Sequence, residues 1–209
     1  MNTSVGFLRK WALKKALDRK EDTQSWRGFH LRKLPSDCFA IQTLLTRCAP
    51  QVIVECGSQY GASAAFIHAF AQHTGLESII SLDITELERP AIPGVTFITG
   101  DSSNPALFQK VKEMVGARSC SVILDSNHHA EHVDKELVLF GQLVTPGQAL
   151  IMEDTHVDVL NFRKFRKAGG PLVSLKKWLP AHPDFIPAEG IEPYVTTNYF
   201  GYWTRKASP

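Results

Sequence analysis

Short apolar runs alternate with helical patterns through the middle of this chain. Five runs rich in Val, Ile and Leu are typical of buried strands, at 51–56, 78–83, 95–99, 119–124 and 148–152. Apolar residues recur between them at helical spacing, over 37–48, 62–73, 104–115 and 130–143. Continuously apolar strands separated by helices predict a parallel sheet that is covered on both faces. We therefore expect an open, doubly wound, Rossmann-like α/β domain.

Two further features complete the predicted fold. Asp37 stands before the first apolar turn of its helix and is expected to be the N-cap. Near the end of the chain, residues 165–179 have a helical pattern, whereas 194–205 are aromatic and β-branched. We expect this last segment to complete the sheet as a C-terminal antiparallel hairpin.

The first residues predict a basic amphipathic helix, which we treat as an extension (1–24) of a single domain (25–209). Its apolar side is expected to carry Val5, Leu8, Ala12 and Ala16. Its charge comes from Arg9, Lys10, Lys14, Lys15, Arg19 and Lys20. Such a helix can bind an anionic membrane surface as a peripheral contact. Packing on the domain or on a second copy in a homo-oligomer is the favoured interpretation.

Composition excludes several classes of protein. A chain of 209 residues fits one domain with a substantial core. A net charge of +2 is too small to indicate a nucleic-acid partner. The four cysteines have neither C-x-x-C nor zinc-finger spacing, so they predict buried side chains in a reducing, cytoplasmic protein. No apolar stretch is long enough to span a bilayer.

Candidate ligand-binding residues follow the predicted strands. Glu55, Gly57 and Gly61 form E-x-G-x-x-x-G after the first strand, which differs from the dinucleotide pattern G-x-G-x-x-G. Asp83 ends the second strand, and Asp101 with Ser102 follows the third. Ligands in such sheets bind beyond the carboxyl ends of the strands, where an acidic residue can accept hydrogen bonds from ribose hydroxyls. These positions therefore predict a nucleoside-containing cofactor.

Three carboxylates predict a metal site at the same edge of the sheet. Asp125 ends the fourth strand, and Glu153 and Asp154 end the fifth. Carboxylates that converge repel one another unless a cation neutralises them. Oxygen ligands favour Mg²⁺, with Mn²⁺ or Ca²⁺ as alternatives. Zinc is a minor alternative, because His128 and His132 are spaced to share a helix face.

His128 is the candidate general base. It follows Asp125 by three residues, so it can remove a proton from a hydroxyl group that the metal acidifies. The resulting oxygen would then attack an electrophilic carbon held in line. His129 and His132 are expected to be ordinary helix-face histidines.

These motifs resemble one family. The segments KLPSD at 33–37, IVECGS at 53–58, LDSNH at 124–128 and EDT at 153–155 are similar to the cephalosporin hydroxylase/rhamnosyl O-methyltransferase family. The resemblance extends over residues 25–205 and implies a class I methyltransferase fold with bound Mg²⁺. The sequence departs from the family pattern at three positions, none of which is a predicted ligand: Ala62, Asn127 and His129.

The resemblance also implies roles for individual residues. S-adenosylmethionine (SAM) would bind along the glycine turn and the following strand ends, at Glu55, Gly57, Ser58, Gly61, Ser63, Asp83, Asp101 and Ser102. Asp125, Glu153 and Asp154 match metal ligands, and His128 matches the general base. The enzyme would methylate a hydroxyl group of a sugar, glycan or secondary metabolite. We expect 155–170 to cover the acceptor, with Phe162, Arg163, Lys164 and Phe165 lining it.

Two alternatives stay open from the sequence. A non-catalytic SAM-binding partner of another enzyme would not need the intact set of Asp125, His128, Glu153 and Asp154. A nucleotide-linked dehydrogenase is disfavoured by the glycine spacing.

Overall fold

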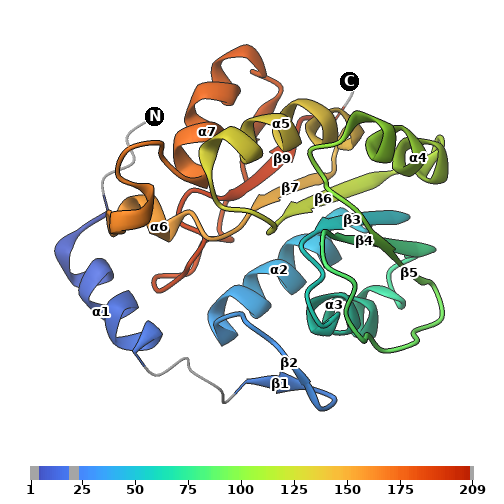
Figure 1. The fold of residues 1–209 in the computed structure, drawn as a ribbon, viewed down its shortest axis with the longest axis horizontal. Coiled ribbons are helices and arrows are strands. Elements are labelled where there is room, and N and C mark those ends of the chain that lie inside the picture. Colours follow the sequence, from blue (N-terminus) through green and yellow to red (C-terminus); the bar gives the residue numbers. More distant parts are fainter. Residues whose placement is uncertain (1–4, 19–23, 208–209) are drawn as a thin grey trace.

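A single twisted sheet organises the protein. The computed structural model describes residues 5–18 and 24–207. In this part of the chain, the strand order of the large sheet is β5-β4-β3-β6-β7-β9-β8 (Figure 1). The parallel strands are β3 (Val52–Cys56), β4 (Ser78–Asp83), β5 (Val95–Thr99), β6 (Cys120–Leu124) and β7 (Ala149–Met152). The strand order reverses between β3 and β6, the place where open α/β sheets bind ligands.

The last two strands run against the others. β9 (Tyr202–Arg205) pairs antiparallel with β7, and β8 (Phe185–Pro187) pairs antiparallel with β9. The predicted doubly wound sheet with a C-terminal antiparallel hairpin is confirmed. The strand within 194–205 is shorter than predicted, because only its last residues pair with β7.

Helices cover both faces of the sheet (Figure 1). α2 (Pro35–Cys48) and α3 (Ala62–Ala71) pack on the face that carries Ile53 and Ile123. α4 (Pro105–Val115), α5 (Ala130–Phe140) and α7 (Pro171–Trp178) pack on the opposite face, with Val54 and Val122. Because successive strand residues point to opposite faces, both layers bury the same strands, as their unbroken apolar sequence predicted.

Shorter elements connect these layers. β1 (Ser25–Trp26) and β2 (Phe29–His30) form a small hairpin before α2. α6 (His156–Val159) follows β7, and single 3-10 turns occur at Gly141–Leu143, Arg163–Phe165 and Leu179–Ala181. α7 begins later than the predicted 165, because Gly169 has a φ of 82° and Gly170 is extended. No helix in the ranges that the structure describes is long and apolar enough to cross a membrane.

The N-terminal helix α1 (Phe7–Leu17) packs on the domain. Val5 and the fully buried Leu13 contact a cluster that includes Leu34 and Tyr199. The predicted apolar side was wrong at Leu8, which is 66% exposed, because the helix turns Leu13 inward instead. Arg19 and Lys20 lie outside the described residues.

Asp37 joins the first helix of the domain to its last segment. The predicted capping role was wrong, since α2 begins at Pro35 with Leu34 as its N-cap. Asp37 is instead fully buried and accepts hydrogen bonds from the Thr196 hydroxyl, from Thr197 N at 2.9 Å and Oγ1 at 2.8 Å, and from the Tyr202 hydroxyl at 3.1 Å. A charged acceptor with several donors is among the stronger hydrogen-bonded groups in a protein.

Replacement of Asp37 by Ala is expected to lower the free energy of unfolding by about 3 kcal/mol, because several buried donors lose their acceptor at once. Urea unfolding followed by circular dichroism measures this loss. Asp134→Ala is the matched control, since its surface pair with Lys177 is expected to contribute under about 1 kcal/mol. Equal losses in the two variants would contradict the structural role of Asp37.

Candidate active site

A cleft of about 830 Å³ opens at the carboxyl ends of the central strands. Gly57 and Asp83 line it from the ends of β3 and β4, and Asp101 and Ser102 line it from the loop after β5. Asp125 and Asp154 reach it from beyond β6 and β7. The structure therefore brings some of the predicted cofactor residues and two of the three predicted metal residues to one cavity.

Only half of the eight predicted cofactor residues line this cleft. Those that do are Gly57, Asp83, Asp101 and Ser102. Asp83 is oriented by backbone donors, because its carboxylate accepts from Gln59 N at 2.7 Å and Thr85 N at 2.9 Å. Of the other predicted residues, Ser58 and Ser63 line a small cavity of about 30 Å³ that shares Gly57 and Asp125 with the cleft, whereas Glu55 and Gly61 are buried outside its lining.

Glu55 organises a buried hydrogen-bond network. Its fully buried carboxylate accepts hydrogen bonds from Ser63 and, at 2.5 Å, from Ser81. Ser58 Oγ lies 2.6 Å from Ser81 Oγ and extends the network toward the turn after β3. Burial raises the pKa of Glu55, while Lys33 and the serine hydrogen bonds oppose that shift. This network fixes the turn between β3 and α3.

Gly57 allows the ends of β3 and β6 to touch. Its φ is 108°, and a Cβ added there would lie 2.1 Å from the carbonyl oxygen of Asp125. A larger residue would therefore push Asp125 out of position. The glycine spacing of the sequence thus reflects close packing beneath the cleft as well as access to a ligand.

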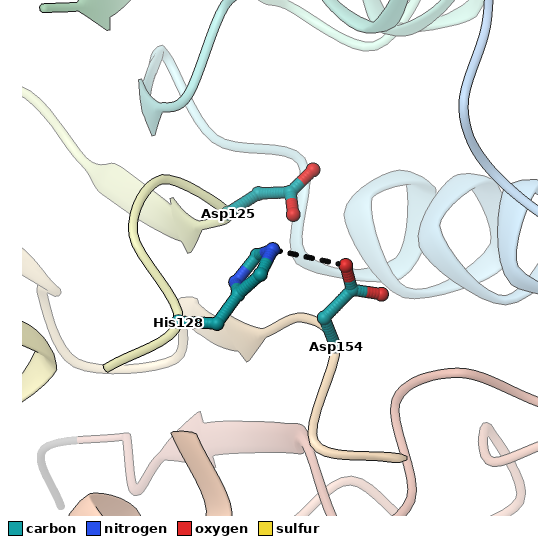
Figure 2. Close-up of side chains that lie close together, drawn as sticks. All are labelled: Asp125, His128 and Asp154. Atoms are coloured by element: carbon teal, nitrogen blue, oxygen red, sulfur yellow. Dashed lines mark ion pairs between the residues drawn. The ribbon is translucent and has the colours of Figure 1, made fainter. Parts of the chain in front are cut away.

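A compact acidic cluster lies at one end of the cleft. Asp125, His128 and Asp154 each offer one ligand atom, and these atoms lie within 4.8 Å of one another (Figure 2). His128 Nε2 is 3.1 Å from Asp154 Oδ2. Asp125 and His128 come from the loop after β6, and Asp154 comes from the segment after β7. Parallel strand ends therefore bring them together as predicted.

Asp154 reaches the cluster through an unusual backbone conformation. Its φ of 52° is in the left-handed region, which Asp and Asn tolerate better than most residues. Asn198 Oδ1 accepts a hydrogen bond from Asp154 N at 2.9 Å and fixes this conformation. Strained conformations of this kind persist where the surroundings determine them, often at functional sites.

Lys33 contacts this cluster, and no sequence pattern had assigned it a role. Its buried ammonium lies 2.8 Å from Asp125 Oδ2 and 2.6 Å from Glu153 Oε1. Burial alone would lower the pKa of Lys33, but the charges of Asp125, Glu153 and Glu55 raise it well above its ordinary value. The ammonium is therefore charged and supports both carboxylates.

Glu153 differs from the other two predicted metal ligands. It is 3% exposed and contacts Lys33, with Asn198 Nδ2 at 3.5 Å from its second oxygen. Burial and the charge of Asp125 raise its pKa, and Lys33 opposes them. The structure thus places Asp125 and Asp154 beside His128 and places Glu153 deeper, next to Lys33.

The chemistry of this cluster fits a divalent cation. With all three carboxylates ionised, the ammonium of Lys33 and a protonated His128 leave one net negative charge in a partly buried region. Burial lowers the pKa of His128, but the hydrogen bond with Asp154 and the surrounding carboxylate charges raise it to about 9. A general base must be neutral, so a further positive charge is needed before His128 can accept a proton. Mg²⁺ matches both the charge and the oxygen donors.

A second polar network was not expected from the sequence. Buried Glu136 accepts from Ser102 Oγ at 2.5 Å and Ser126 Oγ at 2.6 Å, and its Oε1 lies 3.3 Å from His132 Nε2. The expectation that His132 is an ordinary helix-face residue was therefore wrong, because it lines the cleft. Its hydrogen bond with Glu136 raises its pKa. In the described residues, His132 does not join the metal-type cluster, so a two-histidine zinc site gains no support.

The segment after Asp154 covers less of the cleft than expected. His156 lines the cleft, but Phe162 and Phe165 line a separate cavity of about 510 Å³. Phe162 still contacts the ring of His156 edge-on, at 5.4 Å between centroids. From the N-terminal side, His30 and Arg32 line the cleft, and the sequence had not indicated them.

Solved structures share this fold. An apo structure of CmcI has a TM-score of 0.66 at 23% identity, covering 88% of this chain and 77% of that one. CmcI with Mg and SAM gives 0.64 at 21% identity, covering 99% and 87%. MycE methyltransferase from the mycinamycin biosynthetic pathway, in complex with Mg and SAH, gives 0.61 at 18% identity, covering 81% and 48%. At these identities the likeness shows a class I methyltransferase fold.

Curated relatives include rhamnosyl O-methyltransferases of mycobacteria. The Mycobacterium leprae protein is 30% identical over 143 residues, which are 66% of this chain and 62% of the relative. A Mycobacterium tuberculosis protein is 26% identical over 141 residues, 64% of this chain and 58% of the relative. The match thus spans about three fifths of these relatives. A family model described as Rhamnosyl O-methyltransferase/CmcI matches residues 19–206, and the chain therefore belongs to this family.

Proposed function

We propose that this protein is a SAM- and metal-dependent O-methyltransferase acting on a hydroxyl group of a sugar or secondary metabolite. The observation that carries the proposal is the cluster of Asp125, His128 and Asp154 at one end of the cleft, whose other wall carries Asp83 and Asp101. The names of the mycobacterial relatives, and the Mg with SAM or SAH bound in similar structures, support the same chemistry.

The cofactor would lie along the strand ends. Asp83 would accept hydrogen bonds from the ribose hydroxyls, and Asp101 and Ser102 would border the adenine. Gly57 would border the methionine end, since it has no side chain to block the approach. The other predicted cofactor residues would hold this wall in place. They are Glu55, Ser58, Gly61 and Ser63.

The metal would be held by Asp125, Glu153 and Asp154. A bound Mg²⁺ lowers the pKa of a hydroxyl group that it contacts. Lys33 keeps the carboxylates of Asp125 and Glu153 together, and Asn198 holds the backbone of Asp154. The imidazole ring of His128 would accept the acceptor's hydroxyl proton, and Asp154 Oδ2, 3.1 Å from Nε2, would stabilise the imidazolium that forms. The acceptor oxygen would form a bond to the methyl carbon of SAM as the bond from that carbon to sulfur breaks, so S-adenosylhomocysteine would be the leaving group.

Replacement of Asp154 by Asn tests the metal site. Asn tolerates the same left-handed backbone, so the variant removes a charge without changing the fold. We expect calorimetry to show Mg²⁺ affinity at least about tenfold weaker, with SAM affinity in the absence of metal unchanged. The control is Asp184→Asn, whose carboxylate pairs with Arg205 away from the cleft. Unchanged Mg²⁺ affinity would contradict the assignment of Asp154.

The reaction itself can be tested with a panel of sugar and phenolic acceptors. SAM turnover should need both an acceptor and Mg²⁺, and a chelator should abolish it. Tight binding of NAD without binding of SAM would contradict the proposed function.

A further inference from the structure

The outward side of α1 is apolar and basic. Phe7, Leu8 and Trp11 are 80%, 66% and 55% exposed. Successive helix residues are rotated by about 100°, so these three side chains and the exposed Lys14 and Lys15 share one side of the helix. We call these five residues the α1 outer face.

This exposure does not come from a loosely attached helix. Leu13 is fully buried beneath α1, and Arg9 binds Glu192 at 2.8 Å and the carbonyl oxygen of Tyr194 at 2.9 Å. The Tyr199 hydroxyl also donates to the carbonyl oxygen of Arg9. The domain therefore fixes the helix and presents the α1 outer face to its surroundings.

A basic cavity adjoins this helix. The cavity of about 510 Å³ is lined by apolar residues that include Phe165 and Leu172, and by the cations Lys10, Arg166, Lys167 and Lys176. Asp158 is the acidic residue of the lining, and its carboxylate already accepts from Gly170 N at 2.7 Å and Leu172 N at 2.9 Å. The positive charges of the lining thus lack a matching set of negative ones.

We propose that the α1 outer face and the adjoining basic cavity dock on an anionic lipid bilayer. Aromatic and aliphatic side chains on a basic helix suit the boundary between head groups and acyl chains. Lysines bury their stems and keep their charges among anionic head groups. A second copy of this chain is a poor occupant, because pairing two such faces would bring four lysines into one interface with no acidic residue among the five of either face.

Sedimentation with lipid vesicles tests the proposal. The full chain should bind vesicles that contain phosphatidylglycerol. It should not bind vesicles made only of phosphatidylcholine. Phe7→Ser with Trp11→Ser should weaken binding at least about tenfold, because it removes the exposed aromatic anchors. Lys14→Glu with Lys15→Glu should have an effect of similar size, and it should shrink at high salt.

Matched controls lie on α4 and α5, two helices that are separated from α1 (Figure 1). Val138→Ser removes a side chain of α5 that is 64% exposed, and Lys110→Glu with Lys112→Glu reverses two exposed charges on α4. Both controls should bind vesicles as the unmodified chain does. Equal binding by all variants, or equal binding to both lipids, would overturn the proposal. The proposal would also be overturned if the chain did not bind vesicles and instead formed a dimer in ultracentrifugation that Phe7→Ser with Trp11→Ser dissociates.

Discussion

Replacement of His128 by Gln is expected to lower kcat for methyl transfer by about 10²- to 10⁴-fold. The imidazole lies 3.1 Å from Asp154 and within the acidic cluster, which places a titratable base beside the proposed metal. Gln keeps a polar side chain of similar length but cannot take up a proton. The loss should therefore appear in kcat, with SAM affinity unchanged.

The same variant separates two roles for His128. A base contributes to turnover, whereas a metal ligand also contributes to Mg²⁺ affinity. Calorimetry with Mg²⁺ should show no loss of affinity if His128 is the base. His129→Gln is the matched control, because His129 packs on Phe165 and is absent from the lining of the cleft. An unchanged kcat in His128→Gln would contradict the proposed mechanism.

Replacement of Lys33 by Met is expected to lower the free energy of unfolding by about 3–5 kcal/mol. The substitution leaves Asp125 and Glu153 next to each other without the cation that now lies between them. Methionine fills a similar volume, so the loss reflects unpaired charge more than lost packing. The effect should be partly reversed by Mg²⁺, because binding to the folded state alone adds stability.

Urea unfolding with and without Mg²⁺ measures both effects. Adding Glu153→Gln to Lys33→Met should recover part of the loss, since the double variant no longer buries an uncompensated carboxylate there. Lys177→Met is the control, because this lysine is 72% exposed and its ion pair is expected to contribute under about 1 kcal/mol. A loss of that small size in Lys33→Met would show that the buried ion pair does not support the cluster.

Much of the fold and part of the site follow from local pattern. Unbroken apolar strands separated by helices predicted the parallel sheet, and the strands at 78–83 and 95–99 have the predicted bounds. The rule that parallel strands end at one edge was enough to predict that Asp125 and Asp154 lie close together. His128 followed from its spacing to Asp125.

The remaining residues of the site depend on contacts that no local pattern encodes. Lys33 is 92 residues from Asp125 and 120 from Glu153, and it occurs in a connection without helical or strand periodicity. Asn198 supports Asp154 across 44 residues. Lys33 and Asp37 did belong to the KLPSD segment that carried the family resemblance, so a signal was present, but it named no partner. Glu136 resembled any polar residue on an amphipathic helix.

The contact between Asp37 and Thr196–Asn198 has a consequence for synthesis of the protein. A ribosome synthesises α2, all five parallel strands and every acidic residue of the cluster before it adds Thr196. Domains begin to fold from the N-terminal side while the chain is still growing. The donors that satisfy Asp37, and the Asn198 side-chain oxygen that holds the Asp154 backbone, are synthesised after all of these elements. The acidic end of the cleft can therefore be completed only after residues 196–198 have been synthesised, later than every strand of the parallel part of the sheet.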